Sequence, residues 1–152
     1  MIRFCEDKNE IIPLWQEAFG DTEEEIEFFT DNVKNASCLV YCKDDKIASM
    51  MFLVDCFIDG KKGKYAYACC TLKEYRGLGL MSELLSFAQN EKYNFLCLIP
   101  ASDSLIDFYE KRGFTKREKI GKISFEQIPE IKEYLFEGFE LTNPVILINS
   151  GD

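Results

Sequence analysis

The stretch that decides the fold is residues 67–85, which read YACCTLKEYRGLGLMSELL. It begins as an apolar run typical of a buried β-strand and ends in an apolar pattern with helical spacing. Between the two parts stands RGLG, at residues 76–79. A strand that enters a helix through a glycine-containing turn is a candidate anion site, because the first helical turn has unpaired N–H groups and a partial positive charge.

The two glycines of this turn suit the approach of a phosphate group. Gly77 and Gly79 carry no Cβ, so an anion can come close to the backbone, and Arg76 supplies a permanent positive charge. The alternative is a plain tight turn that uses two permissive glycines. A dinucleotide fingerprint would need a third glycine where Ser82 stands, and the Gly-Lys-Ser/Thr of a P-loop is absent.

The rest of the chain predicts a mixed α/β fold. Apolar runs bounded by turn residues predict an antiparallel meander over 37–42, 46–58 and 64–72. Helical periodicity resumes at 78–91, and the apolar run 94–99 suits a strand buried on both faces. Further helices are expected at 9–19, after Thr22, from a cap at Ser102 or Asp103 to about Arg112, and at 128–137. Further strands are expected at 2–5, at 145–148 and, as one strand or a hairpin, within 114–126.

Composition predicts an ordinary intracellular domain. The chain has 152 residues, 47% of them hydrophobic, which is the size and core content of one domain. No long uncharged apolar window and no signal peptide is evident, which predicts a cytoplasmic protein without a membrane association. Its seven cysteines form no Cys-x-x-Cys pair and lie mostly in apolar runs, as in a reducing compartment. Without histidine a zinc site would need four cysteines, so we expect no metal.

The net charge and the absence of histidine limit the partners and the catalytic mechanisms that the sequence allows. A net charge of −9 argues against nucleic acid as a partner and would attract a cationic small molecule, although solubility alone also explains it. With no histidine in the chain, Ser-His-Asp and Cys-His mechanisms are excluded. Proton transfer would then fall to carboxylates, Tyr, Lys, Cys, a chain terminus or water.

EYRGLGLM, residues 74–81, resembles the acetyl-CoA signature of the GNAT N-acetyltransferase superfamily, Arg/Gln-x-x-Gly-x-Gly/Ala. Arg76 and Gly79 match, whereas Met81 stands where glycine or alanine is common. The Gly-Leu-Met ending is similar to the branch around the enhanced intracellular survival protein. That branch carries extra domains, so its aminoglycoside acetylation is not carried over.

A second motif supports this resemblance. SDSLIDFYEKRGF, residues 102–114, is similar to the family segment Asn-x-x-Ala-x-x-x-Tyr-Glu-Lys-x-Gly-Phe. Tyr109 and the residues that follow it match, while Ser102 and Leu105 replace Asn and Ala. The resemblance implies a mostly antiparallel sheet with one splayed parallel pair, flanked by helices. Residues 1–126 would form the acetyl-CoA-binding domain and 127–152 its C-terminal helix and strand.

The resemblance also implies where acetyl-CoA, as a co-substrate, would lie. Its pantetheine would fit between the strands near 67–72 and 94–99 and pair with backbone groups of Cys69, Cys70 and Thr71. The two thiols are interpreted as structural, since no neighbouring base marks them as reactive. The expected cofactor-binding set is Cys69, Cys70, Thr71, Arg76, Gly77, Leu78, Gly79, Leu80, Met81 and Ser102, with the N–H groups of 78–81 on the pyrophosphate.

The reaction implied is direct attack of an amine on the acetyl thioester. A backbone N–H near residues 69–71 would stabilise the oxyanion, and Tyr109, the match to the family tyrosine, would protonate the leaving thiolate. The alternative for Tyr109 is a ring that only packs on the sheet. Spacing does not identify a base among the 27 acidic residues, and the terminal carboxylate of Asp152 is one candidate.

Several alternatives stay open at this stage. The chain could be a non-catalytic acyl-CoA-binding sensor or interaction module on the same fold, or could act without coenzyme A. The acceptor would be a small-molecule or protein amine, and a homodimer is conceivable. Tyr65, Tyr67, Phe28 and Phe29 could line the acceptor pocket, although core packing explains aromatic residues in such positions more simply.

Overall fold

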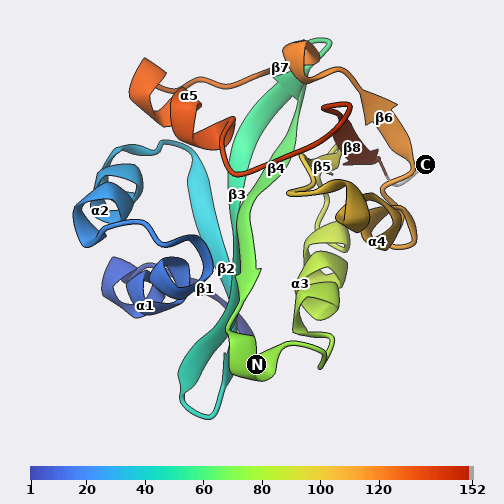
Figure 1. Cartoon of the computed structure of the whole chain (residues 1–152). Coiled ribbons are helices and arrows are strands. Elements are labelled where there is room, and N and C mark those ends of the chain that lie inside the picture. Colours follow the sequence, from blue (N-terminus) through green and yellow to red (C-terminus); the bar gives the residue numbers. More distant parts are fainter. Residues whose placement is uncertain (151–152) are drawn as a thin grey trace.

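Three long strands form the centre of the sheet in the computed structural model, which describes residues 1–150 (Figure 1). They are β2 (Ala36–Lys43), β3 (Lys46–Ile58) and β4 (Lys61–Thr71), each antiparallel to the next. Tight turns at Asp44–Asp45 and Asp59–Gly60 connect them, and all four turn residues have positive φ. Asp, Asn and Gly tolerate this conformation, which explains the sequence of the predicted meander.

Shorter strands extend this meander on both sides. β1 (Ile2–Cys5) pairs with β2, and the other edge adds β5 (Leu96–Leu98), β8 (Ile146–Asn149) and β6 (Lys116–Glu118), so the order is β1-β2-β3-β4-β5-β8-β6. β7 (Ile123–Ser124) pairs separately with β3. Among the strand pairs of residues 1–150, β4 and β5 are parallel and the others are antiparallel. This confirms the mixed α/β class with a mostly antiparallel sheet.

Helices cover both faces of the sheet (Figure 1). α1 (Lys8–Phe19), α2 (Glu23–Asn32) and α5 (Pro129–Leu135) pack on one face, around Trp15 and Phe29. α3 (Leu80–Gln89) and α4 (Ile106–Glu110) pack on the other, around Leu84 and Phe114. Short 3-10 turns lie at Lys73–Tyr75, Asp103–Leu105 and Ile120–Lys122. Thr22 and Glu25 form the predicted capping box of α2.

Three local predictions were wrong. The third helix begins at Leu80 rather than 78, because Gly79 has a left-handed φ of 79° at its N-cap, and Leu78 is left 57% exposed. Neither Ser102 nor Asp103 caps the next helix with its side chain, since Asp103 accepts from the N–H of Thr142 instead. Residues 114–126 contain no hairpin, because β6 pairs with β8 and β7 with β3.

The last part of the chain completes the sheet and crosses its front. β8 lies between β5 and β6, and the segment from α5 to β8 passes over β4 towards β5 (Figure 1). There the N–H of Glu140 donates to the carbonyl of Ala101 at 2.8 Å, and the hydroxyl of Thr142 donates to Asp103 at 2.6 Å. These bonds hold residues 137–143 against the loop between β5 and α4.

Candidate functional site

β4 and β5 separate soon after they meet. Their ladder contains only Lys64 opposite Leu96 and Tyr65 opposite Cys97, whereas β4 continues to Thr71. β5 ends at Leu98, just before Pro100, which has no N–H to offer a ladder. The β5-facing edge of residues 66–71 is therefore an unpaired strand edge inside the sheet, to which an extended ligand can add as a strand does.

A bulge in β4 marks the start of this unpaired edge. Met50 pairs with Cys70 and Phe52 with Tyr67, so Met51 alone faces Ala68 and Cys69. Ala68 has a φ of 56°, and the other non-glycine residues with positive φ in residues 1–150 are all Asn or Asp. A left-handed alanine costs about 1–2 kcal/mol, and such strain gathers at functional sites.

The backbone strain at Ala68 can be measured by replacing this residue with glycine. We expect Ala68→Gly to leave the free energy of unfolding unchanged or to raise it by up to about 1 kcal/mol, because glycine adopts positive φ without cost. Ala36, also partly buried against the same core, does not have positive φ. Ala36→Gly should therefore lower stability by about 1 kcal/mol. Equal losses in urea denaturation would show that the bulge is unstrained.

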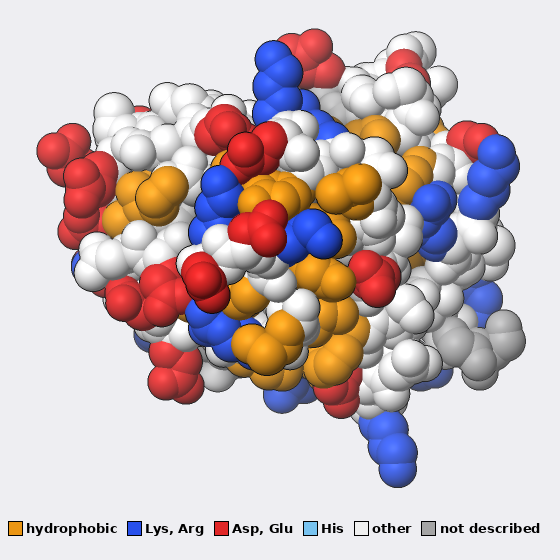
Figure 2. Space-filling view, turned by 90° about the horizontal axis from the view of Figure 1, so that it is seen from below, with side chains coloured by type: hydrophobic (Ala, Val, Ile, Leu, Met, Phe, Trp, Pro, Cys, Tyr) orange, Lys and Arg blue, Asp and Glu red, His pale blue; other side chains and the backbone are white. Residues whose placement is uncertain are grey.

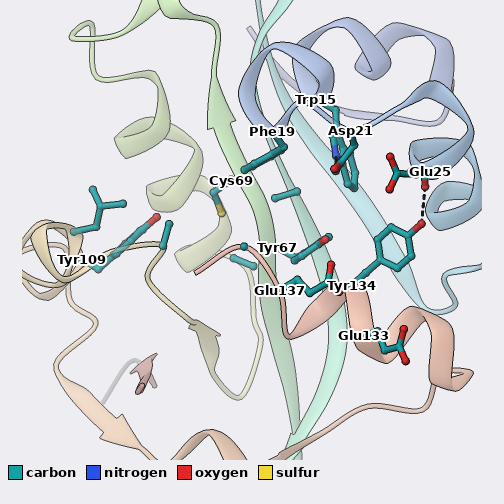
Figure 3. Close-up of a pocket in the computed structure, with 15 residues that line it drawn as sticks. Trp15, Phe19, Asp21, Glu25, Tyr67, Cys69, Tyr109, Glu133, Tyr134 and Glu137 are labelled. Atoms are coloured by element: carbon teal, nitrogen blue, oxygen red, sulfur yellow. Dashed lines mark hydrogen bonds between the residues drawn. The ribbon is translucent and has the colours of Figure 1, made fainter. Parts of the chain in front are cut away.

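A cavity of about 400 Å³ opens where β4 leaves β5 (Figure 3). Its inner wall comes from β4, the loop after β5 and α4, with Ala68, Cys69 and Tyr109 among the lining residues. The outer wall comes from α1, α2, α5 and the loops that follow α1 and α5, together with Tyr67 of β4, and it is aromatic and acidic. The outer lining residues are Trp15, Phe19, Asp21, Glu25, Tyr67, Glu133, Tyr134, Glu137 and Gly138. No Lys or Arg belongs to the lining.

Tyr109 points its phenol into this cavity from α4 (Figure 3). Its ring is only 7% exposed and packs edge-on against Phe108 and Phe114. The hydroxyl has no hydrogen-bond partner among residues 1–150, and burial raises its pKa well above that of an ordinary phenol. The side chain thus combines the packing role with a hydroxyl that stays neutral and can donate a hydrogen bond to a ligand.

The two neighbouring cysteines are protonated thiols. Cys69 packs with the α3–α4 side of the core and Cys70 with the α1–α2 side. Burial raises the pKa of Cys69 to about 12 and that of Cys70 well above its usual range. Neither thiol therefore has thiolate character at neutral pH, and an acyl-cysteine intermediate has no activated nucleophile here.

A second cavity of about 400 Å³ lies at the start of α3. Gly77 and Gly79 have φ of 80° and 79°, and no atom lies within 4 Å of where a Cβ would be. The first helical hydrogen bond joins the N–H of Glu83 to the carbonyl of Gly79, so the N–H groups of Leu80, Met81 and Ser82 have no helical partner. Such an open, donor-rich helix start fits an anion.

Arginines border this second cavity on both sides. Arg76 donates from Nε to the carbonyl of Thr71 at 3.1 Å, which leaves the terminal guanidinium nitrogens available. Arg112 lies on the opposite wall. Its Nε donates to the hydroxyl of Ser82, and its guanidinium carbon lies 3.6 Å from the centre of the Phe108 ring. From the sequence, Arg112 was expected only as the end of a helix. Its one signal was its place in the YEKRGF segment.

The predicted site residues divide between the two cavities. Cys69 and Tyr109 line the first, and Thr71, Arg76, Gly77, Gly79, Leu80 and Met81 line the second. Cys70 turns its side chain to the other face of β4, and Leu78 stands exposed in the turn. Ser102 lines neither cavity, because its hydroxyl pairs with that of Ser104 at 2.9 Å. The proposed base Asp152 lies outside the described residues.

Carboxylates give the outer wall of the first cavity its charge. The Asp21 carboxylate accepts from the indole N–H of Trp15 at 2.8 Å, and Glu25 is occupied by the backbone N–H of Thr22. The side chains of Glu133 and Glu137 have no hydrogen bond or ion pair within the described part of the chain. Figure 2 shows that acidic side chains also prevail on the neighbouring α1–α2 side of the surface.

No group of three or more acidic or cysteine side chains in residues 1–150 could hold a metal ion. Across the same residues, no helix has the length and hydropathy needed to cross a membrane.

Comparison with known sequences and structures assigns the fold. The sequence model of the acetyltransferase (GNAT) domain matches residues 5–117. A GNAT-family acetyltransferase from Staphylococcus aureus Mu50 is 17% identical, with a TM-score of 0.62 over 100% of both chains. A GNAT-family acetyltransferase from Elizabethkingia anophelis, solved with acetyl-CoA bound, is also 17% identical, with a TM-score of 0.61 over 99% of this chain and 97% of its own.

A longer protein shares the same fold. A conserved protein of Enterococcus faecalis V583, described as a probable N-acyltransferase, is 22% identical with a TM-score of 0.59. It matches 74% of this chain, which corresponds to only 31% of its own length. At these identities the likeness shows the fold alone. Among curated proteins, none matches the chain.

The open, glycine-bounded start of α3 beside a splayed parallel strand pair is the arrangement that the sequence predicted for an acyltransferase of this fold. Because the family model covers most of its length, the chain belongs to the GNAT acetyltransferase family, which uses acetyl-CoA. The closer resemblance to the enhanced intracellular survival branch is not confirmed by these comparisons.

Proposed function

We propose that this protein transfers the acetyl group of acetyl-CoA to a primary amine by direct attack within a ternary complex. The observation that carries the proposal is the first cavity, which joins a buried phenol and an unpaired strand edge on one side to a wall of carboxylates on the other. Donor and acceptor can therefore approach the same point from the two faces of the sheet.

The cofactor side of the site fits acetyl-CoA. The open start of α3 and the two arginines suit a diphosphate, and the unpaired edge of β4 suits the amide groups of pantetheine. Bound there, the thioester supplies an activated acetyl group. A backbone N–H at the Ala68–Cys69 bulge would face its oxygen as negative charge develops.

Proton movement would use residues on opposite walls. The incoming amine is mostly protonated at neutral pH, since alkylammonium groups titrate near 10, and the carboxylates of the outer wall would accept its proton through water. The phenol of Tyr109 would donate to the leaving thiolate. Because the cysteines of the site are protonated, the acetyl group passes straight to the amine.

The proposal predicts binding and turnover separately. Acetyl-CoA at about 100 times its Kd should stabilise the protein by roughly 2.7 kcal/mol, measured as a rise in Tm. Thiol release should then require an amine, tested with a panel of polyamines, aminoglycosides, amino acids and peptides. A Tm rise without release from any amine would favour an acyl-CoA-binding sensor, and no rise would contradict coenzyme binding altogether.

A further inference from the structure

The outer end of the first cavity has its own arrangement of charges and rings. Tyr67 lies between the reaction side and this end, and its pKa is raised to well above its usual range by burial and then by the charges of Asp21 and Glu137. The pKa of Tyr134 is raised by burial, then by the charge of Glu25 and by those of the same two carboxylates. Both carboxylates therefore act on both phenol rings, and Figure 3 shows the four side chains around the same end of the cavity.

Local structure holds this group in place. The Trp15 indole orients Asp21 through one carboxylate oxygen, and Tyr134 donates from its hydroxyl to the carbonyl of Glu25 at 2.9 Å. Glu137 comes from the segment that is bonded to the loop after β5. The two carboxylates are thus presented to the cavity by two separate segments, the loop between α1 and α2 and the segment after α5.

An independent observation marks the inner end as a ligand site. The phenol of Tyr109 is more than nine-tenths buried, aims into the cavity and has no partner in residues 1–150. No fully buried side-chain oxygen or nitrogen in residues 1–150 lacks a partner, so the Tyr109 hydroxyl opens onto the cavity, where a ligand or water can bond to it. The cavity therefore has a reaction end at Tyr109 and a charged end at Asp21 and Glu137.

We propose that the acceptor is an aliphatic amine that carries a second ammonium group, and that Asp21 and Glu137 hold this second group against the rings of Tyr67 and Tyr134. The inference rests on the proposed function, because it concerns the same cavity. Two carboxylates and two electron-rich ring faces suit an ammonium ion. The aromatic and alanine walls between the two ends suit a methylene chain.

The same lining disfavours other acceptors. An amino acid would bring its carboxylate to a cavity without any Lys or Arg in its lining, and like charges repel there. A simple alkylamine would fill the apolar part but leave the two carboxylates without a positive charge beside them. The second positive charge is therefore the feature that distinguishes substrates.

Three probes of one chain length test this idea. Cadaverine has an amine at each end of a five-carbon chain, pentylamine has one amine, and the matching ω-amino acid has a carboxylate at its far end. We expect kcat/KM for cadaverine to exceed that for pentylamine by about tenfold, as two partly exposed ion pairs and a ring contact allow. The ω-amino acid should be the poorest, and the preference should shrink in about 0.5 M salt.

Variants assign the preference to its residues. Glu137→Gln and Asp21→Asn should each lower the cadaverine-to-pentylamine ratio of kcat/KM by about threefold. Both amines are measured with the same variant, so a loss of proton acceptance common to both amines cancels in this ratio; the amide introduced by Asp21→Asn can still accept from the indole N–H of Trp15. Glu140→Gln is the matched control, since it removes the same charge three positions further along outside the cavity lining. If the cadaverine-to-pentylamine ratio fell equally in all three variants, the preference would depend only on the net charge of the protein. The assignment of the preference to Asp21 and Glu137 would then be overturned.

The outcomes separate this inference from the proposed function. Transfer to pentylamine and cadaverine at equal kcat/KM would leave an amine acetyltransferase but overturn the second ammonium site. Transfer to peptides and to neither of these amines would also leave an amine acetyltransferase and overturn the second ammonium site. With no transfer to any amine the proposed function fails. In that case the cation site is tested by binding alone, as the rise in Tm that each amine gives to the protein with bound acetyl-CoA. A larger rise with cadaverine than with pentylamine would support the site, and equal rises would overturn it.

Discussion

Tyr109→Phe should lower kcat by about 100-fold and leave the Kd for acetyl-CoA within a factor of two. A positioned proton donor contributes about 10²–10⁴-fold, and the phenol is the donor that the first cavity offers on the side of the leaving thiolate. Steady-state thiol release and acetyl-CoA titration measure the two quantities. An unchanged kcat would reduce Tyr109 to a ring that packs on Phe108 and Phe114.

Stability distinguishes this effect from damage to the fold. The Tyr109 hydroxyl has no partner in the described residues, so its loss should not lower the free energy of unfolding. Tyr65 is the matched control because it is also a buried tyrosine, yet it donates to the carbonyl of Leu135 at 2.7 Å and does not line the cavity. Tyr65→Phe should cost about 1 kcal/mol and leave kcat unchanged.

The pH profile gives a further check on the same residue. The raised pKa means that Tyr109 remains protonated up to and beyond the ordinary phenol value of about 10. Activity should therefore rise with pH as the amine or its base loses a proton, and kcat should not fall again below about pH 10. A falling limb near pH 8 that disappears in Tyr109→Phe would contradict the raised pKa.

Local signals predicted the cofactor side of the site. A strand, two glycines and a helix follow one another within residues 67–85, so their spatial relation is set by short-range geometry. The meander was equally readable, because Asp and Gly stand where its turns need positive φ. Leu78 misled the helix assignment because it fits the apolar period, whereas the left-handed Gly79 starts the helix later.

The acceptor side could not be predicted in this way. Asp21, Tyr67 and Glu137 lie on different elements, and only the antiparallel meander and the returning C-terminal segment bring them to one cavity. From the local sequence, each is more simply interpreted as a solvent-exposed acidic residue or as an aromatic residue of the core. Tyr67 was among the proposed acceptor residues and lines the cavity, whereas Tyr65 and Phe29 are core residues. Only tertiary structure separates the two roles.

The phosphate assignment makes the second large prediction. Gly79→Val should weaken acetyl-CoA binding by about tenfold to 100-fold, since a branched side chain would stand where the diphosphate must reach the N–H groups of Leu80 and Met81. Hydrogen bonds to a charged group are each worth about 1.5–3 kcal/mol, and 1.4 kcal/mol is a factor of ten. Titration calorimetry with acetyl-CoA gives the Kd directly.

Backbone strain alone must be excluded as the cause. Gly60 provides the control, because its φ of 78° and its empty surroundings match the 79° and the open space at Gly79, yet it lies in the β3–β4 turn outside both cavities. Valine should strain the backbone about equally at the two positions, so the two variants should lose similar stability. Only Gly79→Val should also lose affinity. If both variants bound acetyl-CoA as tightly as the parent protein, the start of α3 would not be where the coenzyme's phosphates sit.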